Sequence, residues 1–346
     1  SRFVHPGEVF VALSGERAQG QDFVLGARER GAVAILTDQP LDVALDCPVV
    51  VVPNLRMQLS ALAARFYGYP SRSLHVVGVT GTNGKSSVCD LLQQAWRALG
   101  LSGAAIGTLG VYGQTQWRRP GMTTADPIQV QAELAMLRDA GVTHVAMEVS
   151  SHGLVQGRVE AVEFQCGVFT NLSRDHLDYH GTLDAYAQAK QRLFTELSCA
   201  HRVLNADTPA AVAVADPQAS LYGSQGTISI SDAQADSAGW RFTLNVQDQT
   251  RACRTHLLGV FNLDNLCAVV AVLLNQGVAL DAIANLIPQL SAVPGRMEWV
   301  SHQPAVLVDY AHTPDGLSAA LMAARQHCQG QLWLVFGAGG DRDVGK

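Results

Sequence analysis

The residues with the clearest chemical signal form one short run of glycines, hydroxyl and amide side chains and a lysine: Gly81, Thr82, Asn83, Gly84, Lys85, Ser86 and Ser87. Glycines let a main chain approach phosphate oxygens, and backbone N–H groups at a helix start attract them. Lys85 supplies a positive charge, and the Ser86 hydroxyl suits Mg²⁺. The run therefore predicts a Mg²⁺-nucleotide site.

Two alternatives apply to this run. Its glycine spacing departs from the strict Walker A pattern, because Val79 stands five residues before Gly84, so an ordinary glycine-rich turn is the other reading. A GTPase is disfavoured, because no Asn-Lys-x-Asp segment follows the run.

Acidic and histidine side chains follow two predicted strands. Glu148 lies near the end of an apolar run over 143–149, at the edge of an α/β sheet where ligands gather, so it is a candidate Mg²⁺ ligand or an exposed strand-end acid. Asp175, His176, Asp178 and His180 crowd the segment 171–180. That density indicates oxygen-rich Mg²⁺ coordination with one histidine, or a solvated turn.

A lysine falls on the apolar side of a predicted helix over 182–197. The apolar positions recur at helical spacing, and Lys190 stands among them. Burial there lowers the pKa of an ammonium and favours the neutral amine, which reacts with CO₂ to give a carbamate able to bind metal. A lysine whose head reaches solvent at the helix rim is the alternative.

The remaining pattern indicates an α/β protein of two or three domains, because 346 residues exceed one ordinary core, and three segments can be distinguished along the chain. Residues 1–70 predict a small domain with strands over 9–13, 32–37 and 49–52 and helices over 21–30 and 54–67. A strand over 74–79 opens the central domain, 71–297, with buried parallel strands at 143–149 and 166–169, an antiparallel insertion within 219–260 and a helix over 262–275.

The last segment, 298–346, predicts a strand over 305–309, a helix over 315–327 and a strand over 331–336. This resembles the start of a Rossmann-like domain. Two parallel strands and one helix cannot cover such a sheet, so we expect the third domain to be truncated here, as we expect the N-terminus to be.

Composition excludes several classes of function. The net charge of −6 and the lack of a basic patch argue against nucleic-acid binding. Seven cysteines without a CxxC pair indicate reduced thiols and a cytoplasmic protein. No apolar stretch approaches the roughly 20 residues of a membrane-spanning helix, so membrane insertion is not expected.

Together these segments resemble the Mur ligase family, and the sequence motifs at 148–154 and 171–190 are similar to those of its MurE subgroup. The resemblance covers essentially the whole chain. It implies a three-domain architecture with a central parallel-sheet ATPase domain, ATP on the loop 81–87, and Mg²⁺ held by Ser86, Glu148 and His176. It also implies that Lys190 is carbamylated and steadies a second Mg²⁺.

The resemblance further implies two sets of binding residues. Those for the nucleotide of ATP are Asn262, Asn265, Arg296 and Asp309. Those for a UDP-linked muramoyl dipeptide are Ser1, Glu16, Arg17 and Ala18 on the UDP, and Thr123, Thr124, Ser150, Gln156 and Arg158 on the dipeptide. Met122 stands where we expect asparagine in many relatives, so one polar contact is replaced.

The implied reaction joins a free amino acid, meso-diaminopimelate in the subgroup whose motifs these are, to UDP-MurNAc-L-Ala-D-Glu through an acyl phosphate. Alternatives are a lysine-adding enzyme, another Mur ligase, a folylpolyglutamate synthase, or a nucleotide-binding module without activity. We expect a monomer.

Overall fold

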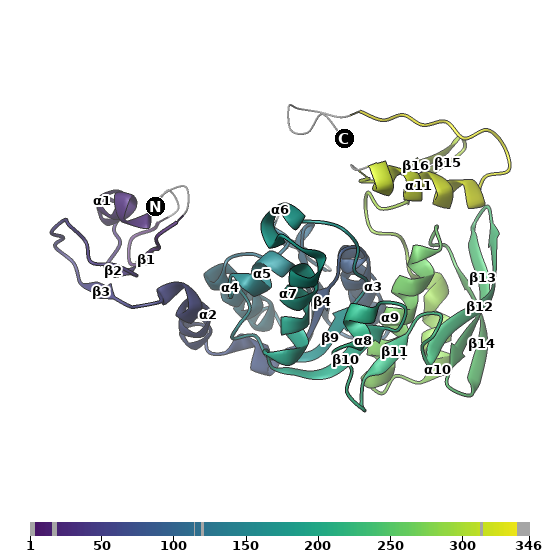
Figure 1. Ribbon diagram of the computed structural model, residues 1–346, viewed down its shortest axis with the longest axis horizontal. Helices are drawn as coiled ribbons and strands as arrows, with labels where there is room; N and C mark the ends of the chain where they lie inside the picture. Colours follow the sequence, from purple (N-terminus) through teal and green to yellow (C-terminus); the bar gives the residue numbers. More distant parts are fainter. Residues whose placement is uncertain (1–3, 16–18, 114, 119–120, 312–313, 338–346) are drawn as a thin grey trace.

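The computed structural model describes residues 4–15, 19–113, 115–118, 121–311 and 314–337. It is an α/β protein, as predicted, with one large sheet and two small ones (Figure 1). The small sheets lie at the two ends of the molecule in the view of Figure 1, so the large sheet and its helices form the centre.

The N-terminal sheet has three parallel strands in the order β1-β2-β3, with an apolar cluster beneath them. Its elements are β1 (Val9–Ala12), η1 (Gly20–Phe23), α1 (Val24–Glu29), β2 (Ala34–Thr37) and β3 (Val49–Val51). The helix predicted over 21–30 therefore begins as a 3-10 turn. The three predicted strands are confirmed.

Helix α2 (Leu55–Phe66) connects this sheet to the centre of the molecule and packs on α4 (Pro127–Asp139). Its buried Ser60 accepts a hydrogen bond from the Ala161 N–H at 3.0 Å, which ties the helix to the central domain. The turn η2 (Pro70–Ser73) follows α2 and leads into the large sheet.

The large sheet has eleven strands in the order β14-β13-β12-β11-β10-β9-β4-β8-β5-β6-β7. Its middle strands are parallel and apolar on both faces, which is typical of a sheet covered by helices. Their bounds are β4 (His75–Thr80), β5 (Gly103–Gly107), β8 (His144–Glu148), β9 (Phe164–Phe169), β10 (Cys199–Asn205) and β11 (Ser220–Tyr222). The short strands β6 (Gly110–Tyr112) and β7 (Gln116–Arg118) add an antiparallel edge.

Helices bury two separate apolar clusters against the two faces of this sheet. One face carries α3 (Lys85–Ala98), α9 (Phe261–Asn275), α10 (Leu280–Leu286) and η3 (Ile287–Gln289). The other carries α4, α5 (Ser151–Val155), α7 (Leu183–Thr195) and α8 (Pro209–Val212), with α6 (Leu177–His180) packed on α7. Because both faces are covered, the carboxyl edge is the open place for a ligand.

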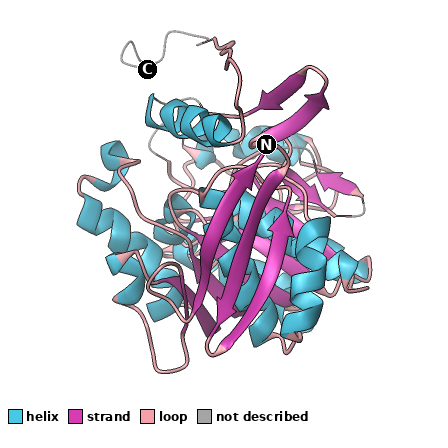
Figure 2. Cartoon of the chain, turned by 90° about the vertical axis from the view of Figure 1, so that its right-hand side faces the viewer, coloured by secondary structure: helices cyan, strands magenta, loops and turns pink. Residues whose placement is uncertain are grey.

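The predicted antiparallel insertion is confirmed. Strands β12 (Ile228–Asp236), β13 (Gly239–Val246) and β14 (Gln249–Thr255) pair antiparallel and extend the large sheet beyond β11. Figure 2 shows these three long strands side by side at the front.

The C-terminal segment contains a hairpin of β15 (Glu298–His302) and β16 (Ala305–Val308), followed by α11 (Pro314–Gln326). The strand predicted over 331–336 is wrong, because the structure assigns this segment to no strand or helix. The apolar run has strand propensity, yet the described residues offer it no parallel neighbour, since β16 pairs with β15 instead.

His327, just after α11, holds this segment to the central domain. Its Nε2 accepts a hydrogen bond from the Gly259 N–H at 3.2 Å, and its Nδ1 donates to the Asp236 carbonyl at 2.8 Å. One nitrogen donates and the other accepts, so the neutral ring fits this position.

Among the described helices, none has the length and apolar character needed to span a lipid bilayer.

A stacked histidine pair at the start of β4 and β8 makes stability depend on pH. The rings of His75 and His144 lie 5.2 Å apart, and burial, then the charges of His144 and His201, lower the pKa of His75 to about 4. Between pH 6.5 and 4 the unfolded chain binds a proton that the folded chain does not, so stability is lost as pH falls through this window.

We expect His75→Gln to lose less stability than the parent protein between pH 7 and pH 4.5. The difference should be roughly 1–2 kcal/mol after allowing for partial exposure. Urea unfolding at the two pH values measures it, with His5→Gln at an exposed turn as the control. Equal acid sensitivity in the parent and His75→Gln would show that this histidine is not responsible.

Candidate functional site

The phosphate loop lies between β4 and α3, as predicted, at the carboxyl edge of the large sheet. Gly81 and Gly84 have φ values of 144° and 85°, which favour glycine. A side chain on Gly81 would also overlap the Thr170 hydroxyl, and one on Gly84 would lie 2.5 Å from Asn265 Oδ1. Both glycines are therefore required by backbone shape and by close packing.

Lys85 is the first residue of α3, and its side chain turns back over the loop. Its Nζ donates to the carbonyls of Gly81 at 2.8 Å and Thr82 at 2.7 Å. Burial lowers the pKa of Lys85, and the nearby carboxylates of Glu148 and Asp175 oppose this. An ammonium has three N–H donors, so one is left for a phosphate oxygen.

Glu148 ends β8 and is almost fully buried, with 3% of its surface exposed. Its Oε1 accepts hydrogen bonds from the Ser86 hydroxyl and from the Thr108 N–H, both at 2.9 Å. Ser86 and Glu148 thus bring a hydroxyl oxygen and a carboxylate oxygen together beside the loop. Hard oxygen ligands of this kind fit Mg²⁺, so these residues could hold the ion that accompanies ATP.

We expect Glu148→Gln to reduce ATP-dependent phosphate release about a hundredfold or more. Glutamine keeps the size of the side chain but removes the negative charge that attracts the metal. The expected signature is a raised Mg²⁺ requirement in a titration at fixed ATP. Glu160→Gln, near the surface after α5, is a matched control. An unchanged Mg²⁺ requirement in Glu148→Gln would contradict the assignment.

Lys190 does not reach solvent. It is 1% exposed, its Nζ donates to the Gly81 carbonyl at 2.8 Å, and it lies 4.2 Å from the centre of the Tyr186 ring. Lys85 donates to the same carbonyl. Burial, and then the charge of Lys85, lower the pKa of Lys190 well below its usual value, while Asp175 opposes this. The interpretation of Lys190 as a rim lysine is therefore wrong.

His176 begins α6 in a left-handed conformation, with φ of 52°. Its Nε2 lies 3.5 Å from a carboxylate oxygen of Asp175, and its ring meets that of His152 edge-on at 4.9 Å. No hydrogen bond joins His176 to Glu148 or Lys190. In the part of the chain that the structure describes, no three His, Cys, Asp or Glu side chains cluster as a ready metal site. His176 as a Mg²⁺ ligand stays a prediction.

Three of the four predicted nucleotide residues lie near the loop or near each other. Asn265 packs on Gly84 and donates from Nδ2 to Asn262 Oδ1 at 2.9 Å. Arg296 is close enough for its charge to lower the pKa of Lys85. Asp309 instead accepts hydrogen bonds from the Met297 and Ala311 N–H groups. Its carboxylate therefore holds the backbone at Met297, directly after Arg296, and at Ala311.

The predicted dipeptide residues form a connected wall that ends at Glu148. The buried Thr124 hydroxyl donates to the Glu148 carbonyl and accepts from the Ser150 N–H, both at 2.9 Å. Arg158 Nη1 donates to the Thr124 carbonyl at 2.5 Å, and Arg158 Nη2 donates to Gln156 Oε1 at 2.6 Å. Thr123 joins this wall through a 2.9 Å hydrogen bond between its hydroxyl and that of Thr108.

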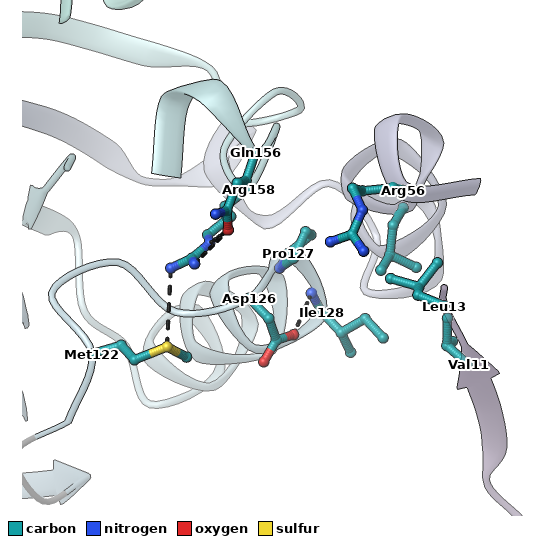
Figure 3. Close-up of a pocket in the computed structure, with 10 residues that line it drawn as sticks. Val11, Leu13, Arg56, Met122, Asp126, Pro127, Ile128, Gln156 and Arg158 are labelled. Carbon is teal, nitrogen blue, oxygen red and sulfur yellow. Dashed lines mark hydrogen bonds between the residues drawn. The ribbon is translucent and has the colours of Figure 1, made fainter. Parts of the chain in front are cut away.

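Gln156 and Arg158 line a pocket of about 320 Å³ between the N-terminal sheet and the central domain (Figure 3). Met122 also lines it, and its sulfur lies 4.0 Å from Arg158 Nη1. From the sequence pattern alone Arg158 is a surface charge, but the structure half-buries it. The predicted UDP residues Ser1, Glu16, Arg17 and Ala18 lie outside the described residues.

Sequence reasoning missed Thr108 and Thr170. The Thr170 hydroxyl donates to the Asn83 carbonyl at 2.5 Å and so fixes the phosphate loop, and Thr108 binds Glu148. Thr108 directly follows β5 and Thr170 directly follows β9, so both lie at the same edge of the sheet as the loop. That position is the signal that could have found them.

Models of the Mur ligase family match almost all of the chain. The Mur ligase catalytic domain matches residues 1–67, the Mur ligase middle domain residues 79–273, and the Mur ligase glutamate ligase domain residues 295–346. This chain belongs to the Mur ligase family. Members of this family are ATP-dependent, ADP-forming amide ligases, so this Mur ligase is an enzyme of that class that uses ATP and Mg²⁺.

Curated relatives of this Mur ligase carry the name UDP-N-acetylmuramoyl-L-alanyl-D-glutamate--2,6-diaminopimelate ligase. The protein of Ectopseudomonas mendocina is 46% identical over 359 residues, and that of Pseudomonas syringae pv. tomato is 47% identical over 362. Each alignment covers 100% of this chain and 74% of the relative.

Solved structures agree with this assignment. A UDP-N-acetylmuramoyl-L-alanyl-D-glutamate--2,6-diaminopimelate ligase superposes with a TM-score of 0.82 at 34% identity, over 99% of this chain and 72% of that one. MurF from Acinetobacter baumannii superposes with a TM-score of 0.73 at 22% identity, over 94% and 70% of the two chains. The second likeness shows the shared fold.

Proposed function

We propose that this Mur ligase adds meso-2,6-diaminopimelate to UDP-N-acetylmuramoyl-L-alanyl-D-glutamate during synthesis of the peptidoglycan precursor. The observation that carries this proposal is the identity of 46–47% with relatives of that name along the whole chain. The phosphate loop with Lys85, Ser86 and Glu148 supplies the ATP chemistry that the reaction needs.

The proposed reaction has two steps. A carboxylate oxygen of the D-glutamyl residue attacks the γ-phosphorus of ATP, the bond to ADP breaks, and an acyl phosphate forms. The amine of the incoming amino acid then attacks the acyl carbon, phosphate leaves with the bonding electrons, and the amine loses a proton. The products are an amide, ADP and phosphate, and no residue of the enzyme is covalently modified in the cycle.

Each part of the site has a task in this scheme. The N–H groups at the start of α3 and the third donor of Lys85 would bind the phosphates of ATP, and Ser86 and Glu148 would hold Mg²⁺. When bound, the metal neutralises phosphate charge. Arg158, fixed by Gln156 and Thr124, presents a guanidinium to the substrate's carboxylates.

We also propose that the domains run over 1–70, 71–297 and 298–346, and that Asn262, Asn265, Arg296 and Asp309 surround the nucleotide. Seven free cysteines among the described residues support work in the reducing cytoplasm. A monomeric state is a prediction that light scattering would test.

The test is ATP-dependent phosphate release from the enzyme with UDP-MurNAc-L-Ala-D-Glu and one of three acceptors. We expect release with meso-diaminopimelate and at least tenfold less with lysine or glutamate. Release with lysine alone would assign the lysine-adding reaction. A separate reaction with a folate in place of UDP-MurNAc-L-Ala-D-Glu and glutamate as the acceptor tests the folylpolyglutamate alternative, which release in that reaction alone would assign. No phosphate release with any of the three acceptors would overturn the ligase proposal.

A further inference from the structure

The pocket between the N-terminal sheet and the central domain is built from both sides. The N-terminal part contributes Val11, Leu13, Arg56 and Leu59, and the central domain contributes Met122, Asp126, Pro127, Ile128, Gln156 and Arg158. Most of these side chains are apolar. The charged groups are therefore few, and their positions decide what the pocket can bind.

Arg56 is a second guanidinium in this pocket. It lies in the first turn of α2, and its Nη2 donates to the Ser14 carbonyl at 2.7 Å, which holds the side chain toward the pocket. Figure 3 shows the guanidinium groups of Arg56 and Arg158 on opposite sides of the space, with Asp126 and Ile128 between them. A guanidinium has five N–H donors, so both groups keep donors for a ligand.

The charges in the pocket favour an anion. Among the described residues that line the pocket, Asp126 is the one carboxylate, and its Oδ1 caps α4 by accepting hydrogen bonds from the Ile128 and Gln129 N–H groups at 3.1 Å. Burial lowers the pKa of Arg158, Asp126 opposes this, and the charge of Arg56 lowers it further. Arg56 and Arg158 together carry two positive charges, and the Asp126 carboxylate, which is already used to cap α4, offsets only one of them. A ligand oxyanion would balance the second charge.

We propose that Arg56 is a substrate-binding residue, which together with Arg158 holds an oxyanion of the UDP-linked substrate across the two domains. This inference rests on the proposed function for the identity of that substrate. The oxyanion is the α-carboxylate of the D-glutamyl residue or the diphosphate of UDP, since both accept hydrogen bonds from a guanidinium in the same way. Arg56 thus adds to the central-domain residues a contact from the N-terminal domain.

The test is calorimetric binding without ATP, which does not depend on catalysis. The ligands are UDP-MurNAc-L-Ala-D-Glu, its analogue with the glutamyl α-carboxylate converted to an amide, and UDP. The variants are Arg56→Gln and, as a matched control, Arg65→Gln, which removes the same charge from an exposed position on the same helix but outside the pocket. We expect Arg56→Gln to raise the Kd for the substrate about tenfold and Arg65→Gln to leave it unchanged.

The ligand series separates the two sources of the oxyanion. A loss that disappears with the amide analogue identifies the carboxylate. A loss that extends to UDP, with a shallower salt dependence of the Kd, identifies the diphosphate. Equal Kd values for Arg56→Gln and Arg65→Gln would overturn the proposal. So would a loss of affinity that is the same for the acid and the amide and absent for UDP, because that pattern indicates altered domain packing.

The outcome is separable from that of the proposed function. If the parent enzyme binds the substrate but releases no phosphate with any acceptor, the ligase proposal fails while the role of Arg56 stands. If it is an active ligase and Arg56→Gln binds normally, only the role of Arg56 fails.

Discussion

Replacing Lys85 with methionine is expected to lower ATP-dependent phosphate release by about a thousandfold, corresponding to roughly 4 kcal/mol of lost transition-state stabilisation. The ammonium is fixed over the loop by the Gly81 and Thr82 carbonyls and keeps one donor for a phosphate oxygen. Methionine has similar length and no charge, so the transferring phosphoryl group would lose the cation at the start of α3.

The measurement is kcat and KM for ATP under saturating substrate. Most of the loss should appear in kcat, because the charge on the transferred group changes as the bond to ADP breaks. Arg97→Met, an exposed residue in the last turn of α3, serves as the control and should retain activity. Retention of more than about a tenth of parental kcat in Lys85→Met would mean that another residue carries this charge.

Replacing Lys190 with alanine is expected to lower activity about a hundredfold or more while leaving the protein folded. Lys85 still donates to the Gly81 carbonyl when Lys190 is removed, so no buried acceptor is left unpaired and the free energy of unfolding should not fall by more than about 2 kcal/mol. If the working form is a carbamate, a small carboxylate such as acetate should restore part of the activity by occupying the vacated space. Thermal unfolding and phosphate release, with and without acetate, measure both effects.

The carbamate itself has a separate test. The neutral Lys190 amine adds to the carbon of CO₂ and loses one proton, which gives an anionic group, and the Lys85 ammonium on the same Gly81 carbonyl makes that negative charge favourable. Because burial lowers the pKa of Lys190, a larger fraction of its amine is neutral at a given pH, and that fraction increases as pH rises. At a fixed concentration of dissolved CO₂, the carbamate content should therefore increase with pH until the amine is fully neutral.

Native mass spectrometry of the parent under bicarbonate, compared with Lys190→Ala, tests for the added CO₂. An unmodified lysine under bicarbonate, together with full activity in Lys190→Ala, would end the carbamate hypothesis. Loss of activity without an added mass would leave Lys190 as a plain cation beside the phosphates and so reject the modification alone.

The phosphate loop and Lys190 could be located from sequence because local patterns determine both. A buried strand and a glycine-rich run follow one another along the chain, and the strand predicted over 74–79 lies within one residue of β4 at each end. Lys190 was identified because a charge interrupted an apolar stripe, and helical periodicity places such a residue in the core. The sequence pattern leaves open the alternative of a lysine that reaches solvent, because burial depends on which helix or sheet covers the position.

Contacts between distant segments could not be predicted in the same way. Arg158 reads as a surface charge until Thr124 and Gln156 are seen to hold it, and Arg56 carries no local signal at all. The strand predicted over 331–336 failed for a related reason, since strand propensity does not supply a partner. The family resemblance singled out Arg158 as a candidate binding residue, because a family motif reflects the three-dimensional contacts that its members share.

The hydrogen-bonded wall from Arg158 through Thr124 to Glu148 also connects the pocket between the two domains to the buried carboxylate beside the phosphate loop. Thr124 takes part at both ends, because its carbonyl accepts from Arg158 and its hydroxyl donates to the Glu148 carbonyl. A displacement of Arg158 would therefore pass through a single residue to the backbone that carries Glu148.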